Sequence, residues 1–164
     1  MFFSCSYLNK YYIIQFRGMT APYKINCHPL TKGSKMAYVY YNPNPYQRRG
    51  IGDCTIRCLA KALNTSWDSA YIELASQGFF LKDMPSSNIV LNSYLHSKGF
   101  RRYAISNLCP DCYTFRDFAK DHPKGTFIVG TGTHVACIKD SNIYDSWNSS
   151  DETPIFYWKR EEKE

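Results

Sequence analysis

The spacing of apolar residues changes at Gly99, and this change constrains the fold more than any other feature of the sequence. Before Gly99, apolar side chains recur about every 3.6 residues, which predicts amphipathic helices. After Gly99, short alternating segments separated by glycine and turn residues predict strands. The expected early helices cover residues 54–63, 67–77 and 88–98, with Gly78 and Gly99 ending the second and the third.

Most of the expected strands lie in the second half of the chain, where one more helix interrupts them. That helix is expected over residues 113–122, before Pro123. Asp140 to Asn142 forms a hairpin turn between two neighbouring strands. Because helices come first and an antiparallel sheet follows, the expected fold class is α+β. The expected strands cover residues 37–41, 100–106, 125–130, 133–139, 143–145 and 154–159.

The chain of 164 residues divides by charge near Met36. Residues 1–35 carry five basic and no acidic side chains, whereas residues 36–164 carry 15 basic and 14 acidic ones. The first segment also lacks a sustained amphipathic period. We therefore interpret residues 1–35 as an N-terminal extension, or as the result of a start site assigned upstream of Met36, and residues 36–164 as a single domain. This nearly neutral domain lacks the basic patch that nucleic-acid binding requires, so we expect none.

The sequence predicts neither a membrane span nor a secretion signal. It has no run of 18 apolar residues, so it predicts no transmembrane helix and no membrane partner. Residues 7–16 make a poor signal-peptide core, because Asn9, Lys10 and Gln15 interrupt them. We therefore expect a cytoplasmic protein. The seven cysteines, an odd number, are then expected to be reduced thiols.

Two of these cysteines have the spacing of metal ligands. Cys109-Pro-Asp-Cys112 fits half of a zinc site or a redox pair. A structural zinc needs four ligands, however, and the sequence has no second CxxC pair. The central Pro-Asp is also ordinary turn chemistry. We therefore expect two free thiols here, and no metal or cofactor.

Cys54 is the cysteine with the features of a nucleophile. Asp53 suits the N-cap of the first helix, so Cys54 lies in its first turn, where the helix dipole favours the thiolate. His134 follows the turn Gly130-Thr-Gly132 at the start of a strand. The next hairpin brings Asp145 back near His134, where its carboxylate would hold the imidazole in a useful tautomer. These three residues have the chemistry of a nucleophile, a base and an orienting acid.

The segments around these residues resemble papain-like cysteine peptidases. They are Gly52-Asp-Cys-Thr-Ile-Arg-Cys-Leu-Ala-Lys-Ala-Leu63, Thr133-His-Val-Ala-Cys-Ile-Lys139 and Ile143-Tyr-Asp-Ser-Trp147. The likeness extends over roughly residues 38–158, and is greatest to compact bacterial and bacteriophage members, including the bacteriocin-processing type. It implies a papain-like fold, with N-terminal helices packed on a C-terminal antiparallel sheet. It assigns the nucleophile to Cys54, the base to His134 and the orienting role to Asp145.

The resemblance also implies a glutamine six residues before the nucleophile, whose side chain helps to form the oxyanion hole. Position 48 is Arg here, and Gln47 lies seven residues before the cysteine. We assign the oxyanion role to Gln47, with Asn42 and Asn44 as alternatives. The Cys54 backbone N–H is the expected second donor.

The expected function is that of a cysteine peptidase or thiol hydrolase, which cleaves an amide in a peptide or protein substrate. The alternative is a papain-fold protein without turnover, for example a bacteriophage protein that binds a host factor in the host cytoplasm. The oxyanion donor separates the two, because a nucleophile without one lacks transition-state stabilisation. A zinc-stabilised nucleic-acid module is a third hypothesis, which metal analysis would settle.

We predict that a chain beginning at Met36 unfolds as cooperatively as the full chain, because all the excess charge and no clear element lie before it. Thermal melting of both proteins, followed by circular dichroism, measures this. Loss of the cooperative transition in the shorter protein would make residues 1–35 part of the core.

Overall fold

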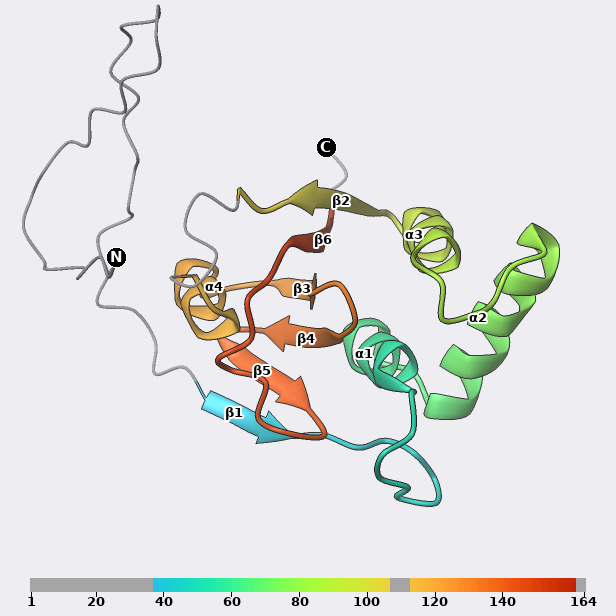
Figure 1. The fold of residues 1–164 in the computed structure, drawn as a ribbon, viewed down its shortest axis with the longest axis horizontal. Helices are drawn as coiled ribbons and strands as arrows, with labels where there is room; N and C mark the ends of the chain where they lie inside the picture. Colours follow the sequence, from blue (N-terminus) through green and yellow to red (C-terminus); the bar gives the residue numbers. More distant parts are fainter. Residues whose placement is uncertain (1–36, 107–112, 162–164) are drawn as a thin grey trace, which may run out of the picture.

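The computed structural model describes residues 37–106 and 113–161, and within them the protein is α+β (Figure 1). The expected N-terminal extension and the Cys109–Cys112 pair lie outside the described residues. The helices are α1 (Cys54–Leu63), α2 (Trp67–Leu81), α3 (Asn88–Ser97) and α4 (Phe115–Asp121). The strands are β1 (Ala37–Tyr40), β2 (Phe100–Ala104), β3 (Thr126–Gly130), β4 (Val135–Lys139), β5 (Asn142–Asp145) and β6 (Phe156–Arg160).

These strands form one mixed sheet in the order β1-β5-β4-β3-β6-β2 (Figure 1). Neighbouring strands are antiparallel except β1 and β5, which run parallel with Ala37 opposite Asn142. This corrects the expectation of a purely antiparallel sheet that follows the helices. The chain from β1 to β5 passes through all four helices, and such a long crossover is what a parallel neighbour needs.

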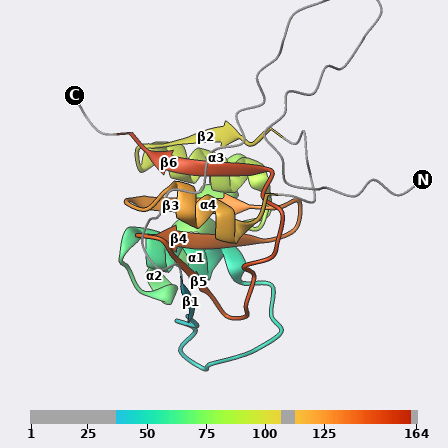
Figure 2. The same cartoon turned by 90° about the vertical axis from the view of Figure 1, so that its left-hand side faces the viewer.

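Helices cover both faces of this sheet. α1, α2 and α3 lie on one face and α4 lies on the other (Figures 1 and 2). Side chains of β3 therefore alternate between two cores: Ile128 packs with the first three helices, whereas Phe127 and Val129 pack with α4. α1 contacts β4 directly. The helix that begins at Cys54 is thus fixed against the strand that follows His134.

α2 continues beyond the glycine at which the sequence predicts its end. Gly78 is buried within α2, and a Cβ there would lie 2.7 Å from the backbone oxygen of Asp83. The glycine therefore permits a close approach of the following loop, and the helix ends instead at Leu81, followed by the C-cap residue Lys82 with a left-handed φ of 56°. Among the described residues, no helix combines the length and apolar character needed to cross a membrane.

A tight hairpin joins β4 to β5, as the sequence predicts. Asp140 and Ser141 have φ values of 49° and 63°, as in a two-residue hairpin loop of type I′. The register pairs Cys137 with Tyr144. Asp145 therefore lies one residue further along β5, toward the end of the hairpin from which His134 projects.

Gly130 at the end of β3 has no room for a side chain, because a Cβ would lie 2.2 Å from a Phe156 ring atom. We predict that Gly130→Ala lowers the free energy of unfolding by about 1–3 kcal/mol, the usual range for overpacking. Gly132→Ala is the matched control, since nothing lies within 4 Å of a Cβ there. Urea unfolding compares the two variants with the parent, and equal midpoints for all three would mean that Phe156 moves aside without cost.

Candidate active site

Cys54 is the first residue of α1 and is partly buried. The preceding Asp53 occupies the N-cap position, but its side chain makes no capping hydrogen bond to the helix. The first N–H groups of any helix lack partners within the helix, and they carry its positive partial charge. This end of α1 therefore favours a negative sulfur, and an anionic oxygen bound next to it.

Asp53 is held by side chains rather than by the helix backbone. It is only 6% exposed and forms an ion pair with Arg57, one turn further along α1. Its Oδ2 accepts hydrogen bonds from the Trp67 indole N–H at 3.0 Å and from the Asn44 side-chain amide at 3.4 Å. Without Arg57, this carboxylate would be an uncompensated negative charge next to Cys54 and would raise the pKa of the thiol.

His134 immediately precedes β4, and a hydrogen-bonded turn fixes its backbone. The Thr131 hydroxyl accepts the His134 N–H at 3.0 Å, and the Thr131 N–H donates to the His134 carbonyl at 2.8 Å. The imidazole is mostly shielded, with its side chain 13% exposed. The indole of Trp147 covers part of it, with 5.2 Å between ring centroids, while Trp147 itself is 44% exposed. The His134 ring is thus held in one position at the surface of the sheet.

Asp145 fixes the orientation of that ring. One carboxylate oxygen, Oδ2, lies 2.6 Å from His134 Nε2 and accepts the Ser149 hydroxyl at 2.7 Å. The other, Oδ1, accepts the Ser146 backbone N–H at 2.7 Å. Since Nε2 faces Asp145, the ring nitrogen available to Cys54 is Nδ1. The structure therefore brings Cys54, His134 and Asp145 together in one hydrogen-bonded series.

The pKa values of the thiol and the imidazole move in opposite directions. Burial would raise the pKa of Cys54, but hydrogen bonds to His134 and to the Val135 backbone outweigh it, and the pKa lies below its ordinary value. Burial would lower the pKa of His134, whereas its hydrogen bonds to Asp145 and Cys54 raise it to about 9. The two groups titrate as a coupled pair, because each charged form stabilises the other, and the pairing shifts the thiol toward the thiolate.

Gln47, the expected oxyanion donor, is not directed at this series. It is exposed, has a φ of 51°, and its amide donates to the backbone oxygens of Asn42 and Asn44 at 3.1 and 3.0 Å. The extra residue between Gln47 and Cys54 is taken up in a loop that the glutamine itself closes. Of the two alternatives, Asn44 is 3% exposed and contacts Asp53, the residue before Cys54, whereas Asn42 bonds to the Arg48 backbone.

Two further thiols lie behind the site and are inaccessible. Cys58, one turn after Cys54, and Cys137 of β4 are 3% and 0% exposed and hydrogen-bond to each other. Burial raises the pKa of Cys58 well above its ordinary value. Within residues 37–106 and 113–161, Cys54 is therefore the one thiol suited to nucleophilic chemistry, and no three His, Cys, Asp or Glu side chains gather as a metal site would require.

Sequence reasoning missed the groups that support the three central residues. The ion pair of Asp53 with Arg57 has the i, i+4 spacing of a helical pair, so that signal is present in the sequence. The bonds from Asn44, Trp67 and Ser149 carry no comparable signal, because they depend on how loops pack. Their shared effect is to satisfy two buried carboxylates that flank the thiol and the imidazole.

We predict that iodoacetamide at pH 5.5 labels Cys54 before Cys58 and Cys137, and that His134→Ala slows the labelling of Cys54 by about tenfold or more. The reason is that loss of the imidazolium raises the thiol pKa, and each unit of that rise removes about nine-tenths of the thiolate at acidic pH. Peptide mapping by mass spectrometry measures the rate at each cysteine.

His96→Ala is the matched control, since His96 lies on the exposed side of α3 and makes none of these contacts. Its labelling rate should equal that of the parent. An unchanged rate in His134→Ala would contradict the pairing of Cys54 with His134.

Comparisons with known proteins give little further information. No family model matches the chain, and no solved structure matches it. A curated protein of similar sequence is the eukaryotic translation initiation factor 2-alpha kinase PK4 of Plasmodium falciparum (isolate 3D7), which is 31% identical over 109 residues. That match covers 63% of this chain but only 3% of the kinase. The chain is thus similar to a short piece of a much longer protein, and this likeness brings no kinase activity to it.

Proposed function

We propose that the protein is a papain-like cysteine peptidase or related thiol hydrolase that cleaves a peptide or isopeptide amide. The observation that carries this proposal is the series of contacts from the Cys54 thiol through His134 to the buried Asp145. A nucleophile at a helix start, a base before a strand and an acid on the next strand also agree with the papain-like fold that the sequence resembles. A purely structural cysteine would not need a lowered pKa and a histidine held in one orientation.

In this mechanism the Cys54 thiolate attacks the carbonyl carbon, and the carbonyl electron pair moves onto the oxygen. The tetrahedral intermediate collapses to a thioester while the His134 imidazolium gives its proton to the leaving amine. A water molecule then loses a proton to neutral His134 and attacks the thioester, which releases the acid and restores the ion pair. Asp145 remains ionised and holds the ring throughout.

The oxyanion is assigned to the Cys54 backbone N–H and to the side chain of Asn44 rather than Gln47. The Asn44 carbonyl oxygen accepts the Tyr46 backbone N–H at 3.0 Å, so its amino group is the end that faces Asp53. One hydrogen of that amino group bonds to Asp53, the residue before Cys54, and we assign the second to the oxyanion. Removing one such donor typically costs about two to three orders of magnitude in rate.

A second candidate is a protein of this fold that binds a partner without turnover. The observation that favours it is the closed loop of Gln47, which leaves the family's usual donor engaged elsewhere. It differs from the first candidate in requiring no thiolate and no contribution from Asn44 to rate.

We predict that incubation with a proteome-derived peptide pool generates new amino termini, and that Cys54→Ala abolishes them because no other accessible thiol is present in the described site. Asp145→Ala should retain partial activity, since an orienting acid contributes less than the nucleophile. Mass spectrometry of labelled termini measures cleavage. Cys58→Ala is the control for loss of a nearby thiol that is not the nucleophile.

The pH profile gives an independent check. His134 has a raised pKa of about 9, so activity should fall as the pH rises through that value and the imidazolium loses its proton. The acidic limb should lie below the ordinary thiol pKa, because the Cys54 pKa is lowered. Cleavage that survives in Cys54→Ala would contradict Cys54 as the nucleophile, and no cleavage by the parent at any pH would favour the binding protein.

A further inference from the structure

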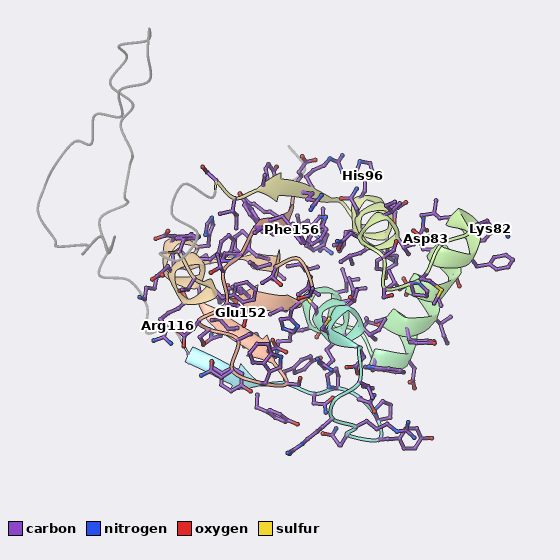
Figure 3. The ribbon with its side chains drawn as sticks, in the orientation of Figure 1. Lys82, Asp83, His96, Arg116, Glu152 and Phe156 are labelled. Atoms are coloured by element: carbon purple, nitrogen blue, oxygen red, sulfur yellow. The ribbon has the colours of Figure 1, made fainter. Side chains whose placement is uncertain are left out.

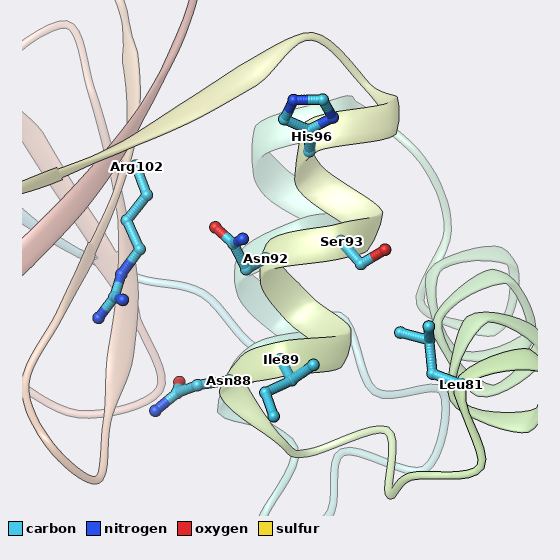
Figure 4. A pocket seen from close by; sticks show the side chains of 7 residues that line it. All are labelled: Leu81, Asn88, Ile89, Asn92, Ser93, His96 and Arg102. Carbon is cyan, nitrogen blue, oxygen red and sulfur yellow. The ribbon is translucent and has the colours of Figure 1, made fainter.

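An open pocket of about 440 Å³ lies on the α3 side of the sheet, at the edge formed by β2 (Figure 4). The outward side of α3 forms its floor, from Asn88 to His96. Leu81 at the end of α2 forms one wall, and Arg102 of β2 forms the other. This volume is within the range of pockets that hold small ligands or short peptide segments.

The charge of the pocket is all of one sign. Arg102 and His96 are its ionisable residues, and no acidic side chain lines it. Among the described residues, Arg102 has no carboxylate partner, whereas its neighbour Arg101 pairs with Glu161 at 3.3 Å. An exposed guanidinium without an acid, in a pocket without acids, is complementary to a carboxylate.

Aromatic rings hold the Arg102 guanidinium in place. It lies 4.2 Å from the centroid of Phe156 and 5.6 Å from that of Trp158, its partner across the strands. A planar cation stacked in this way loses less conformational entropy when it binds an acid than a free side chain does. The position of Arg102 therefore exists before any ligand arrives.

The remainder of the pocket suits a polypeptide. The Asn92 side-chain oxygen accepts the Trp158 indole N–H at 3.0 Å, which leaves the Asn92 amino group free to donate. Asn88 offers a second amide at the same floor. Leu81 and Ile89 are 41% and 69% exposed at the opposite end from His96. Amide donors and acceptors match a peptide backbone, and the two aliphatic side chains match an apolar residue next to the acidic one.

Phe156 connects this pocket to the turn that carries His134. The Phe156 ring supports Arg102 on one side and packs closely on Gly130 on the other, at the start of that turn. Phe156 is the first residue of β6 and packs in the core shared with α1, α2 and α3; Figure 3 labels it together with His96 of α3. Phe156 and Arg102 therefore lie on the same face of the sheet as α1, the helix that begins at Cys54.

We propose that this pocket binds an acidic segment of the polypeptide substrate, with an Asp or Glu carboxylate on Arg102 and an apolar side chain between Leu81 and Ile89. This inference rests on the proposed function, because it names the substrate class of that site. An acidic peptide is the occupant that the observations favour, because the described pocket combines an unpaired guanidinium and amide groups with no acidic side chain.

The test uses the full chain with Cys54→Ala, which prevents cleavage, and two pools of fluorescein-labelled hexapeptides. Each peptide of the first pool contains one Leu and two Glu, in all arrangements. The second pool is the same except that Gln replaces Glu. Fluorescence polarisation should give about tenfold tighter binding of the Glu pool, consistent with a charge-assisted hydrogen bond. The preference should weaken as salt is raised.

Arg102→Gln should remove the preference for Glu, and His96→Gln should reduce it. Arg101→Gln is the matched control, because it makes the same charge change at the next position of β2, where the side chain points to the opposite face. The proposal is overturned if the Glu pool binds no tighter than the Gln pool, or if Arg101→Gln has the same effect as Arg102→Gln. If binding depends on Arg102 but the parent protein cleaves no peptide, the proposed peptidase activity is rejected and the proposed acidic-peptide site is retained.

Discussion

A carboxylate taken out of water has to be hydrogen-bonded, and the arrangement of the site depends on how Asp145 meets this requirement. The residue is 3% exposed, yet both of its oxygens are bonded, to His134, Ser149 and the Ser146 backbone. These bonds join the turn before β4 to the loop after β5. Removing any one partner would leave a buried charge short of a bond, which costs far more than an exposed contact would. The packing of the protein therefore orients the imidazole before any substrate binds.

A second buried charge pair complements the first. Arg57 is 7% exposed and bonds to Asp53, and its positive charge is also attracted to Asp145. One guanidinium thus balances carboxylates on both sides of the Cys54–His134 pair. Ion pairs of this kind contribute little net stability, because desolvation offsets most of the attraction. What Arg57 changes is the local potential, since it keeps the neighbourhood of the sulfur from becoming too negative for a thiolate.

The pairing of Cys54 with His134, 80 residues apart, was expected from the family resemblance, whereas local patterns were sufficient to predict the helices, the β4–β5 hairpin and the proximity of His134 and Asp145. Each of these depends on residues close together in sequence, or on the end of an element where a side chain projects. The parallel pairing of β1 with β5 was not predictable in this way, because nothing in the four-residue sequence of β1 indicates which distant strand it pairs with. The end of α2 at Gly78 was predicted wrongly, because the glycine is required by the close approach of the loop that follows the helix and does not mark the helix end. The assignment of the oxyanion role to Gln47 differs from the structure for a similar reason, because the closure of its own loop decides where the Gln47 amide points.

The β1–β5 pairing has a consequence for how the chain is made. Tyr38 and Asp145, whose hydroxyl and backbone oxygen are 3.3 Å apart, are separated by 107 positions, so nearly the whole domain must leave the ribosome before that edge can close. The helix bearing Cys54 emerges first and His134 follows about 80 residues later, several seconds at ordinary rates of synthesis. During that interval the sulfur lacks the hydrogen bond and the charge of the imidazole, which together lower its pKa in the folded protein. In a nascent chain Cys54 therefore behaves as an ordinary thiol until the strands that carry His134 and Asp145 have paired.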